Sequence, residues 1–292
     1  MSEIRMLRRI ADELSRASGS LEDPNEATAL WAAAQGVKPA EVWLLRESEP
    51  APDVVKRFWQ AVEQRKRGVP FAYTVGRTGF RTLDLAIDPR ALIPRPETEG
   101  LVDLVLKHGS RELGAGTAGL VADIGTGCGC IALALAVEGN FEKVVGVERS
   151  AAAAALAREN VERVAPKTPV EIREGNLLAP LLDKGERGAG AYRVIVANPP
   201  YLTESEFAQL DASVRAFEPR EALVSGASGL DATRGIFAGA GALLERGGLL
   251  ALEIDERRSD AVRDLGRDYG WNVAIHKDVF GCLRYALSIK ED

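Results

Sequence analysis

Apolar residues recur along this chain with two different spacings, and the spacing changes near residue 70. Before that point they return every three or four positions, which predicts amphipathic helices. One such face contains Ile4, Leu7, Ile10 and Leu14. The run Gly68-Val69-Pro70 then breaks the helical pattern. We therefore predict a helical domain over residues 1–70.

Residues 71–95 alternate between apolar and polar positions, which predicts a β-hairpin that leads into a third region over residues 96–292. From Gly119 onward, short apolar runs alternate with helical patterns, and this order predicts a parallel sheet covered by helices on both faces. Seven strands are expected, near Leu120–Asp123, Lys143–Val147, Val170–Glu174, Arg193–Ala197, Gly248–Ile254, Trp271–His276 and Arg284–Ile289. Only a short loop separates the last two strands, so one of them should run antiparallel.

A glycine-rich turn follows the first of these strands. Gly125, Gly127 and Gly129 stand at alternate positions, where they let a ligand approach the backbone closely. The next strand ends in Glu148, about 20 residues later, where nucleotide-binding α/β units place an acid for ribose hydroxyls. Alone, such a turn also fits a dinucleotide site or a plain strand-to-helix connection. However, its spacing is Asp-x-Gly-x-Gly-x-Gly, beginning at Asp123, and differs from the dinucleotide pattern Gly-x-Gly-x-x-Gly.

A second chemical signal is the tetrapeptide Asn198-Pro199-Pro200-Tyr201 at the end of another apolar run. Proline cannot donate to a strand ladder, so the chain must leave the sheet at Asn198. The Asn198 side-chain oxygen and the Pro199 carbonyl are then two acceptors that suit a planar –NH2 group, such as a glutamine amide or an adenine. Tyr201 adds a flat ring for that group. The alternative is an ordinary strand-to-loop turn with a buried tyrosine.

The candidate residues share a position in the predicted sheet. Asp123, Glu148, Asn176 and Asn198 each fall at the carboxyl end of a strand. In open α/β sheets ligands bind beyond these ends, at the point where the strand order reverses. We therefore expect the four side chains to converge on one cleft.

The glycine turn resembles the first motif of the S-adenosylmethionine-dependent methyltransferases, in which the turn holds the methionine part of the cofactor and the later acid holds the ribose. The whole chain resembles the release-factor glutamine methyltransferases of the HemK/PrmC type. The segments that carry this resemblance are Pro70–Gly76 through Phe80, Leu92–Glu99, Asn198–Tyr201, Glu218–Leu223, and Asp278 with Gly281 and Arg284. The N-terminal region matches in length and helical character.

The resemblance implies an α/β fold: a seven-stranded, mostly parallel class I methyltransferase (Rossmann-like) sheet, with a small helical N-terminal domain joined by a β-hairpin. It implies S-adenosyl-L-methionine as cofactor, S-adenosyl-L-homocysteine as product, and the glutamine of a Gly-Gly-Gln loop in a class 1 peptide chain release factor as substrate, docked partly by residues 1–70. The implied catalytic residues are Asn198, Pro199, Pro200 and Tyr201. The implied cofactor-binding residues are Asp123, Gly125, Thr126, Gly127, Cys128, Gly129, Glu148, Asn176, Leu177 and Asn198.

Three segments depart from the family pattern. Asn176 stands where many relatives have Asp, Asp255 stands where Gly is usual, and Ser225–Leu230 is altered. These changes leave the chemistry intact but weaken the inference to the substrate. Two alternatives stay open: a methyltransferase for an exocyclic amino group of DNA or RNA, and a non-catalytic cofactor-binding protein.

Composition narrows the choice of partner. The 292 residues carry a net charge of −6, which argues against stable nucleic-acid binding. Cys128 and Cys130 are too close together for a zinc knuckle, and the two histidines have no ligand pattern around them, so no metal site is expected. No apolar run is long enough to cross a membrane. We expect a cytoplasmic monomer without a membrane partner.

Overall fold

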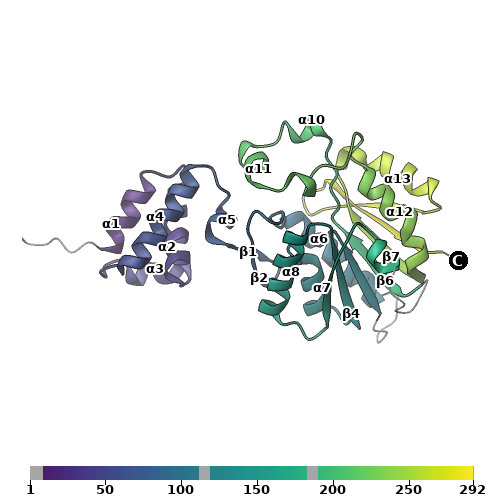
Figure 1. The fold of residues 1–292 in the computed structure, drawn as a ribbon, viewed down its shortest axis with the longest axis horizontal. Helices are drawn as coiled ribbons and strands as arrows, with labels where there is room; N and C mark the ends of the chain where they lie inside the picture. Colours follow the sequence, from purple (N-terminus) through teal and green to yellow (C-terminus); the bar gives the residue numbers. More distant parts are fainter. Residues whose placement is uncertain (1–8, 112–118, 183–189, 292) are drawn as a thin grey trace, which may run out of the picture. The chain divides into compact units, whose positions relative to one another are not determined.

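The computed structural model describes residues 9–111, 119–182 and 190–291, and its chain separates into two compact units (Figure 1). The first comprises Met1–Gly76 together with Ala212–Phe217. The second comprises Arg77–Asp211 and Glu218–Asp292. Each unit has a hydrophobic core of its own.

The first unit is a bundle of short helices. They are α1 (Ile10–Ser18), α2 (Glu26–Gln35), α3 (Pro39–Leu45), α4 (Pro52–Lys66) and α5 (Phe71–Val75). The compact unit also includes the short helix α11 (Ala212–Phe217). Trp31 and Phe58 are fully buried at its centre, with ring centroids 4.8 Å apart in an edge-to-face arrangement. The charged end of α4 is tied back to α2 because Arg65 pairs with Glu26 at 2.6 Å.

The strand predicted at the start of residues 71–95 is wrong, because Phe71–Val75 forms helix α5. Phe71 and Val75 are four residues apart, so a helix places both on one face, and both pack against the core of the bundle. Gly76 ends the helix in the left-handed conformation, with φ +70°. The hairpin itself is shorter than predicted and comprises β1 (Arg77–Phe80) and β2 (Leu83–Ala86).

The second unit is built on a seven-stranded sheet. In chain order the strands are β3 (Leu120–Ile124), β4 (Lys143–Glu148), β5 (Val170–Glu174), β6 (Tyr192–Ala197), β7 (Leu244–Glu253), β8 (Ala274–Lys277) and β9 (Leu283–Ile289). Their order across the sheet is β5-β4-β3-β6-β7-β9-β8. Strands β5, β4, β3, β6 and β7 are parallel, whereas β9 runs antiparallel to both of its neighbours. The predicted sheet is therefore confirmed.

Helices cover both faces of this sheet (Figure 1). One face carries α6 (Pro96–Arg111), α7 (Cys130–Glu138) and α8 (Ala151–Val164); the other carries α12 (Asp231–Leu243) and α13 (Ser259–Asp268). Short helical turns complete the unit: α9 (Ala179–Leu182), α10 (Glu204–Phe207), η1 (Arg220–Ala222) and η2 (Glu256–Arg258). Because both faces are covered, the central strands are buried and read as continuous apolar runs.

Within the described parts of the chain, no helix is both long and apolar enough to span a lipid bilayer.

Candidate active site

The glycine turn between β3 and α7 is shaped by left-handed backbone conformations. Gly125, Gly127 and Gly129 have φ values of +73°, +57° and +87°. The turn is fastened to the next strand, because the backbone N–H groups of Gly125 and Thr126 both donate to the carbonyl of Val147, at 2.8 and 3.0 Å. A Cβ atom added at Gly125 or Gly127 would meet no atom within 4 Å. Open space therefore lies directly above the turn.

Asp123 supports this turn from beneath. It is fully buried, and its Oδ2 accepts hydrogen bonds from the Thr126 hydroxyl at 2.6 Å and from the Ala132 N–H at 3.1 Å. Its Oδ1 has no hydrogen-bond partner among the described residues. Burial raises the pKa of Asp123 to about 7, against the effect of those two hydrogen bonds. Asp123 thus holds the start of α7 against the turn.

Glu148, at the tip of β4, is held by two backbone groups. Its Oε2 accepts from the Gly127 N–H at 2.9 Å, and its Oε1 accepts from the Ser150 N–H at 2.8 Å. The Ser150 hydroxyl in turn accepts from the Ala153 N–H and caps helix α8. A carboxylate has about four acceptor positions, so each oxygen of Glu148 retains capacity for a further donor.

Asn198 leaves β6 at the same edge of the sheet, and two buried side chains lie behind it. Its Nδ2 donates to the Thr98 hydroxyl at 3.1 Å, and that hydroxyl donates to Oε2 of Glu253 at 2.7 Å. Thr98 comes from the first turn of α6 and Glu253 from the end of β7. Nearby, burial raises the pKa of Tyr201 to about 12, so its phenol stays protonated at neutral pH.

Two segments from distant parts of the chain form the remaining wall. Glu218 is buried, and it accepts from the Ile93 N–H at 3.2 Å and from the Arg95 guanidinium at 2.6 Å. An isolated parallel bridge joins Leu202 to Val224, so the chain that leaves the tetrapeptide is fastened beside the segment that follows Glu218. The segments Leu92–Glu99 and Glu218–Leu223, which form this wall, both carry the family resemblance.

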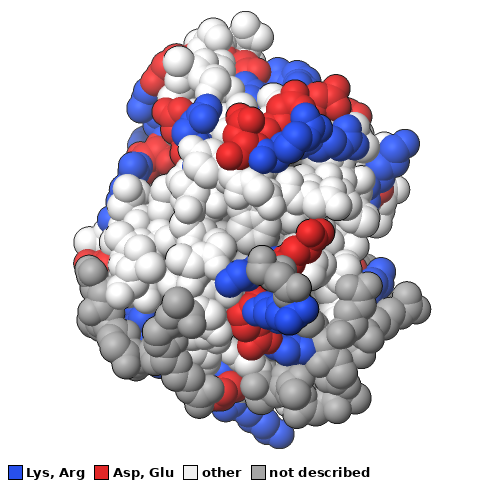
Figure 2. Space-filling view, turned by 90° about the vertical axis from the view of Figure 1, so that its right-hand side faces the viewer, with Lys and Arg blue, Asp and Glu red and all other residues white. Residues whose placement is uncertain are grey.

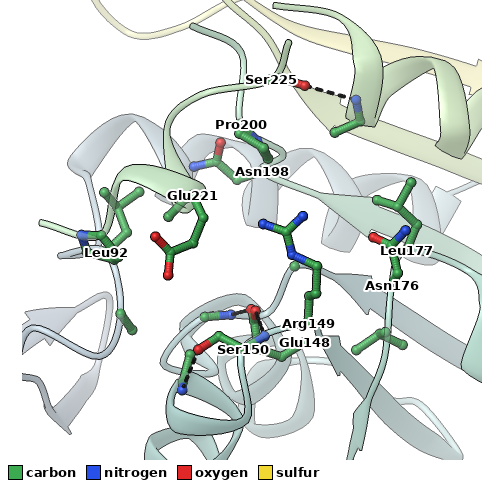
Figure 3. A pocket seen from close by; sticks show the side chains of 18 of the residues that line it. Leu92, Glu148, Arg149, Ser150, Asn176, Leu177, Asn198, Pro200, Glu221 and Ser225 are labelled. Carbon is green, nitrogen blue, oxygen red and sulfur yellow. Dashed lines mark hydrogen bonds between the residues drawn. The ribbon is translucent and has the colours of Figure 1, made fainter. Parts of the chain in front are cut away.

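These elements enclose a cavity of about 400 Å³ at the carboxyl edge of the parallel strands. Figure 3 shows Glu148 and Ser150 on one side of it, Asn176 and Leu177 on another, and Asn198 with Pro200 on a third. Strands β3 and β6 are neighbours there, and the sheet's strand order reverses between them. A cavity of this size lies within the ordinary range for small-molecule sites.

The structure separates the predicted site residues into two groups. Those that line the cavity are Gly125, Gly127, Glu148, Asn176, Leu177, Asn198 and Pro200. Those that do not line it are Asp123, Thr126, Cys128, Gly129, Pro199 and Tyr201. The cleft expected at the strand ends thus exists, with Asp123 placed beneath it.

Other cavity residues were missed by the sequence reasoning, among them Arg90, Leu92, Arg149, Glu221 and Ser225. In Figure 3 the side chains of Arg149 and Glu221 extend into the space from different walls. Arg149 directly follows Glu148, so its position next to a predicted site residue could have identified it. Glu221 and Leu92 lie inside segments that resemble the family but have no strand end to mark them.

The cavity fits the parts of S-adenosylmethionine that the sequence suggests. The open backbone over Gly125 and Gly127 leaves room for a close-lying chain, and the remaining acceptor positions on Glu148 suit two vicinal hydroxyls. Asn176 lies further along the wall, with an amide that can bond to a heterocyclic base.

Comparison with known proteins places these observations in a family. A model of the PrmC N-terminal domain matches residues 5–76, and a model of the methyltransferase small domain matches residues 103–218. A release factor glutamine methyltransferase of Moorella thermoacetica is 40% identical over 87% of this chain and 86% of its own length. The chain belongs to the release factor glutamine methyltransferase family. A second member, from Deinococcus radiodurans, is 37% identical over 83% of each chain.

Family membership confirms the resemblance drawn from the motifs. A crystal structure of a methyltransferase from Pyrococcus furiosus shares the fold, with a TM-score of 0.52 and 21% identity over 73% of this chain and 92% of that one. The match to the N-terminal domain model covers the helical residues that carried the weakest sequence signal.

Proposed function

We propose that this protein transfers a methyl group from S-adenosylmethionine to the side-chain amide nitrogen of a glutamine, in the Gly-Gly-Gln loop of a peptide chain release factor. The observation that carries this proposal is the position of Asn198. Its amide lines the cavity beside the glycine turn, and its –NH2 group is already bonded to Thr98. Its oxygen is therefore left to accept from a substrate amide.

The cofactor would supply an activated methyl group on a sulfonium centre. We assign the glycine turn (Gly125 to Gly129) to its methionine part, Glu148 to its ribose, and Asn176 with Leu177 to its adenine. Asp123 and Thr126 keep the turn in shape through their hydrogen bond.

An amide nitrogen is a weak nucleophile because its lone pair is delocalised into the carbonyl. The protein's contribution would therefore be positional. The Asn198 oxygen and the Pro199 carbonyl accept the two amide hydrogens, which fixes the nitrogen and favours the positive charge that develops on it. Pro200 and Tyr201 hold the plane of the amide and exclude water. The proton leaves to solvent after transfer.

A protein amide is favoured over an amino group of a nucleic acid. The chain is acidic, at −6 overall, and on the face seen in Figure 2 basic side chains are interspersed with acidic ones. Proteins that bind nucleic-acid phosphates ordinarily present a basic patch. Release factors act on ribosomes, so we propose the cytoplasm as the compartment.

Asn198→Ala is the direct test of this assignment. It removes one of two acceptors aimed at the substrate nitrogen and leaves the glycine turn intact. We expect turnover on a release factor to fall about a hundredfold or more, as when one preorganised transition-state partner is lost. Cofactor affinity, measured by calorimetry, should change little. A release factor whose Gly-Gly-Gln glutamine is replaced by alanine is the substrate control.

Near wild-type methylation by Asn198→Ala would show that the positional mechanism is wrong. Methylation of the control substrate, or of DNA or RNA in preference to release factor, would replace the substrate assignment. Cofactor binding without turnover on any of these substrates would favour the non-catalytic alternative.

We further propose that the helical unit docks the release factor. Trp43 and Leu44 on α3 are 70% and 74% exposed, and adjacent exposed apolar side chains are a feature of interaction surfaces. Replacing both with serine should raise KM for intact release factor while leaving the rate on a free Gly-Gly-Gln peptide unchanged, because remote contacts position only the whole substrate. Tyr269→Ser, which alters an exposed aromatic residue of the other unit, is the matched control. Equal KM values for the double variant and the control would contradict the docking role.

A further inference from the structure

Two polar side chains, Thr98 and Glu253, are buried behind Asn198. Thr98 and Glu253 are each 2% exposed, and neither lines the cavity. They are 155 residues apart in the chain, yet one hydrogen bond of 2.7 Å joins them and a second of 3.1 Å joins Thr98 to Asn198. Burying a carboxyl group costs free energy unless it is hydrogen-bonded. We therefore asked what these hydrogen bonds do for Asn198.

The hydrogen-bond chain has a direction. An ionised carboxylate can only accept, so Glu253 must take the single proton of the Thr98 hydroxyl. The Thr98 oxygen is then limited to accepting, and the group of Asn198 that faces it must be the –NH2. The other end of the amide, its Oδ1, is thereby directed away from Thr98.

Protonation of Glu253 would remove this direction. A carboxylic acid can donate to Thr98, and the Thr98 hydroxyl can then donate to the amide oxygen of Asn198. The amide could turn over and present its –NH2 to the substrate –NH2, which places two donors against each other. An acceptor aimed at the substrate would be lost although only the Asn198 amide had turned.

We infer that Thr98 and Glu253 are positioning residues that keep the Asn198 oxygen turned toward the substrate nitrogen when Glu253 is ionised. This inference rests on the role proposed for Asn198. It assigns a function to two residues that do not line the cavity and that act only through Asn198.

The groups around Glu253 set the pH at which it ionises and holds the Asn198 amide in this orientation. Burial raises the pKa of Glu253 to about 7, helped by the negative charge of Glu97 on α6 and opposed by the hydrogen bonds from Thr98 and Asn198 and by Arg284 on β9. The phenols of Tyr201 and Tyr285 also face it and stay protonated, because burial raises both of their pKa values to about 12. At saturating cofactor and substrate, kcat should therefore rise with pH, with a midpoint near 7.

The sharpest test compares three variants across the pH range. Thr98→Val removes the hydroxyl but keeps the side-chain shape, so kcat should fall roughly tenfold, less than the loss expected for a direct partner such as Asn198, because Thr98 acts only through Asn198. KM and the cofactor Kd should stay the same. Thr98→Ser restores the hydroxyl and should restore kcat. Glu253→Gln can accept from Thr98 without titrating, so its kcat should be nearly independent of pH around 7.

Two controls separate this effect from loss of structure. Thr233→Val changes another buried threonine, 2% exposed on α12, and should leave kcat unchanged. Asp123→Asn removes the other carboxyl whose pKa lies near 7, and its kcat profile at saturating cofactor should keep the step that Glu253→Gln loses.

The outcomes distinguish the two proposals. If Asn198→Ala is inactive while Thr98→Val has wild-type kcat, the positioning role is overturned and the role of Asn198 stands. If Asn198→Ala is active, the proposed function of that residue fails first. A pH step that persists in Glu253→Gln would exclude Glu253 as the titrating group.

Discussion

The contact between Glu148 and the cofactor ribose can be tested quantitatively. Each Glu148 oxygen accepts one backbone N–H, at 2.9 and 2.8 Å, which leaves each free to accept one ribose hydroxyl. A hydrogen bond to a charged group contributes about 1.5–3 kcal/mol, and 1.4 kcal/mol corresponds to tenfold in Kd. Glu148→Ala removes both bonds, so S-adenosylmethionine binding should weaken by at least roughly 10- to 150-fold, the value of one such bond.

Calorimetry on the folded variant measures this loss, and Glu174→Ala is its matched control. Glu174 ends the neighbouring strand in register with Glu148 and pairs with Arg158 at 2.8 Å, and it does not line the cavity that Glu148 lines. Its replacement should leave Kd unchanged. Circular dichroism should show the same helical content in both variants.

The alanine variant could also weaken binding by loosening the turn at Gly127, whose N–H loses its acceptor. A cofactor analogue that lacks the ribose hydroxyls separates the two causes. If Glu148 bonds those hydroxyls, the analogue should lose affinity for the wild-type protein but lose little more for Glu148→Ala, because the two changes remove the same interaction. Fully additive losses, or an unchanged Kd for Glu148→Ala, would refute the assignment.

Two further predictions concern the glycine turn. Gly127→Val should abolish cofactor binding in calorimetry, because its side chain would occupy the open space above the turn, while φ +57° adds backbone strain; wild-type affinity would contradict a ligand in that space. The folded pKa of Asp123, about 7, lies above its ordinary 3.8, so the folded state holds a proton that the unfolded chain has released, and the free energy of unfolding should fall as pH rises between these values. Asp123→Asn should reduce that fall because it removes the titrating carboxyl, while its side-chain carbonyl can still accept from Thr126 and Ala132 in place of Oδ2. Glu253 contributes to the fall with the same sign, so part of it should remain. Thermal unfolding of both proteins across pH measures the difference, and parallel curves would exclude Asp123.

Much of the fold and part of the site could be predicted from local sequence. Strands buried on both faces must be continuous apolar runs, so the sheet could be predicted from the sequence. The glycine turn could be recognised because glycine is favoured where the backbone is left-handed. The tetrapeptide could be recognised because its prolines have no N–H to donate and so end a strand. Glu148, Asn176 and Asn198 then followed from their places at strand ends.

Prediction failed where packing between distant segments decides the outcome. The alternating pattern of residues 71–95 suggested strands, but Phe71 and Val75 pack on the helical bundle, and this contact selects a helix for Phe71–Val75. Likewise Ala212–Phe217 belongs to the compact unit of the N-terminal helices, although it lies within the second half of the chain. Nothing in the local composition of that segment indicates this.

The chemistry of the site divides in the same way. The sequence alone determined which atoms can accept from an amide, because the functional groups of Asn198 and Pro199 belong to the residues themselves. Only the tertiary structure decided which way the Asn198 amide turns, because Thr98 and Glu253 reach it from α6 and β7. Burial, which also depends on the assembled fold, decided that the pKa values of Asp123 and Glu253 lie near 7. A carboxyl group has its ordinary pKa in the extended chain and acquires a different one only when neighbouring segments remove its water.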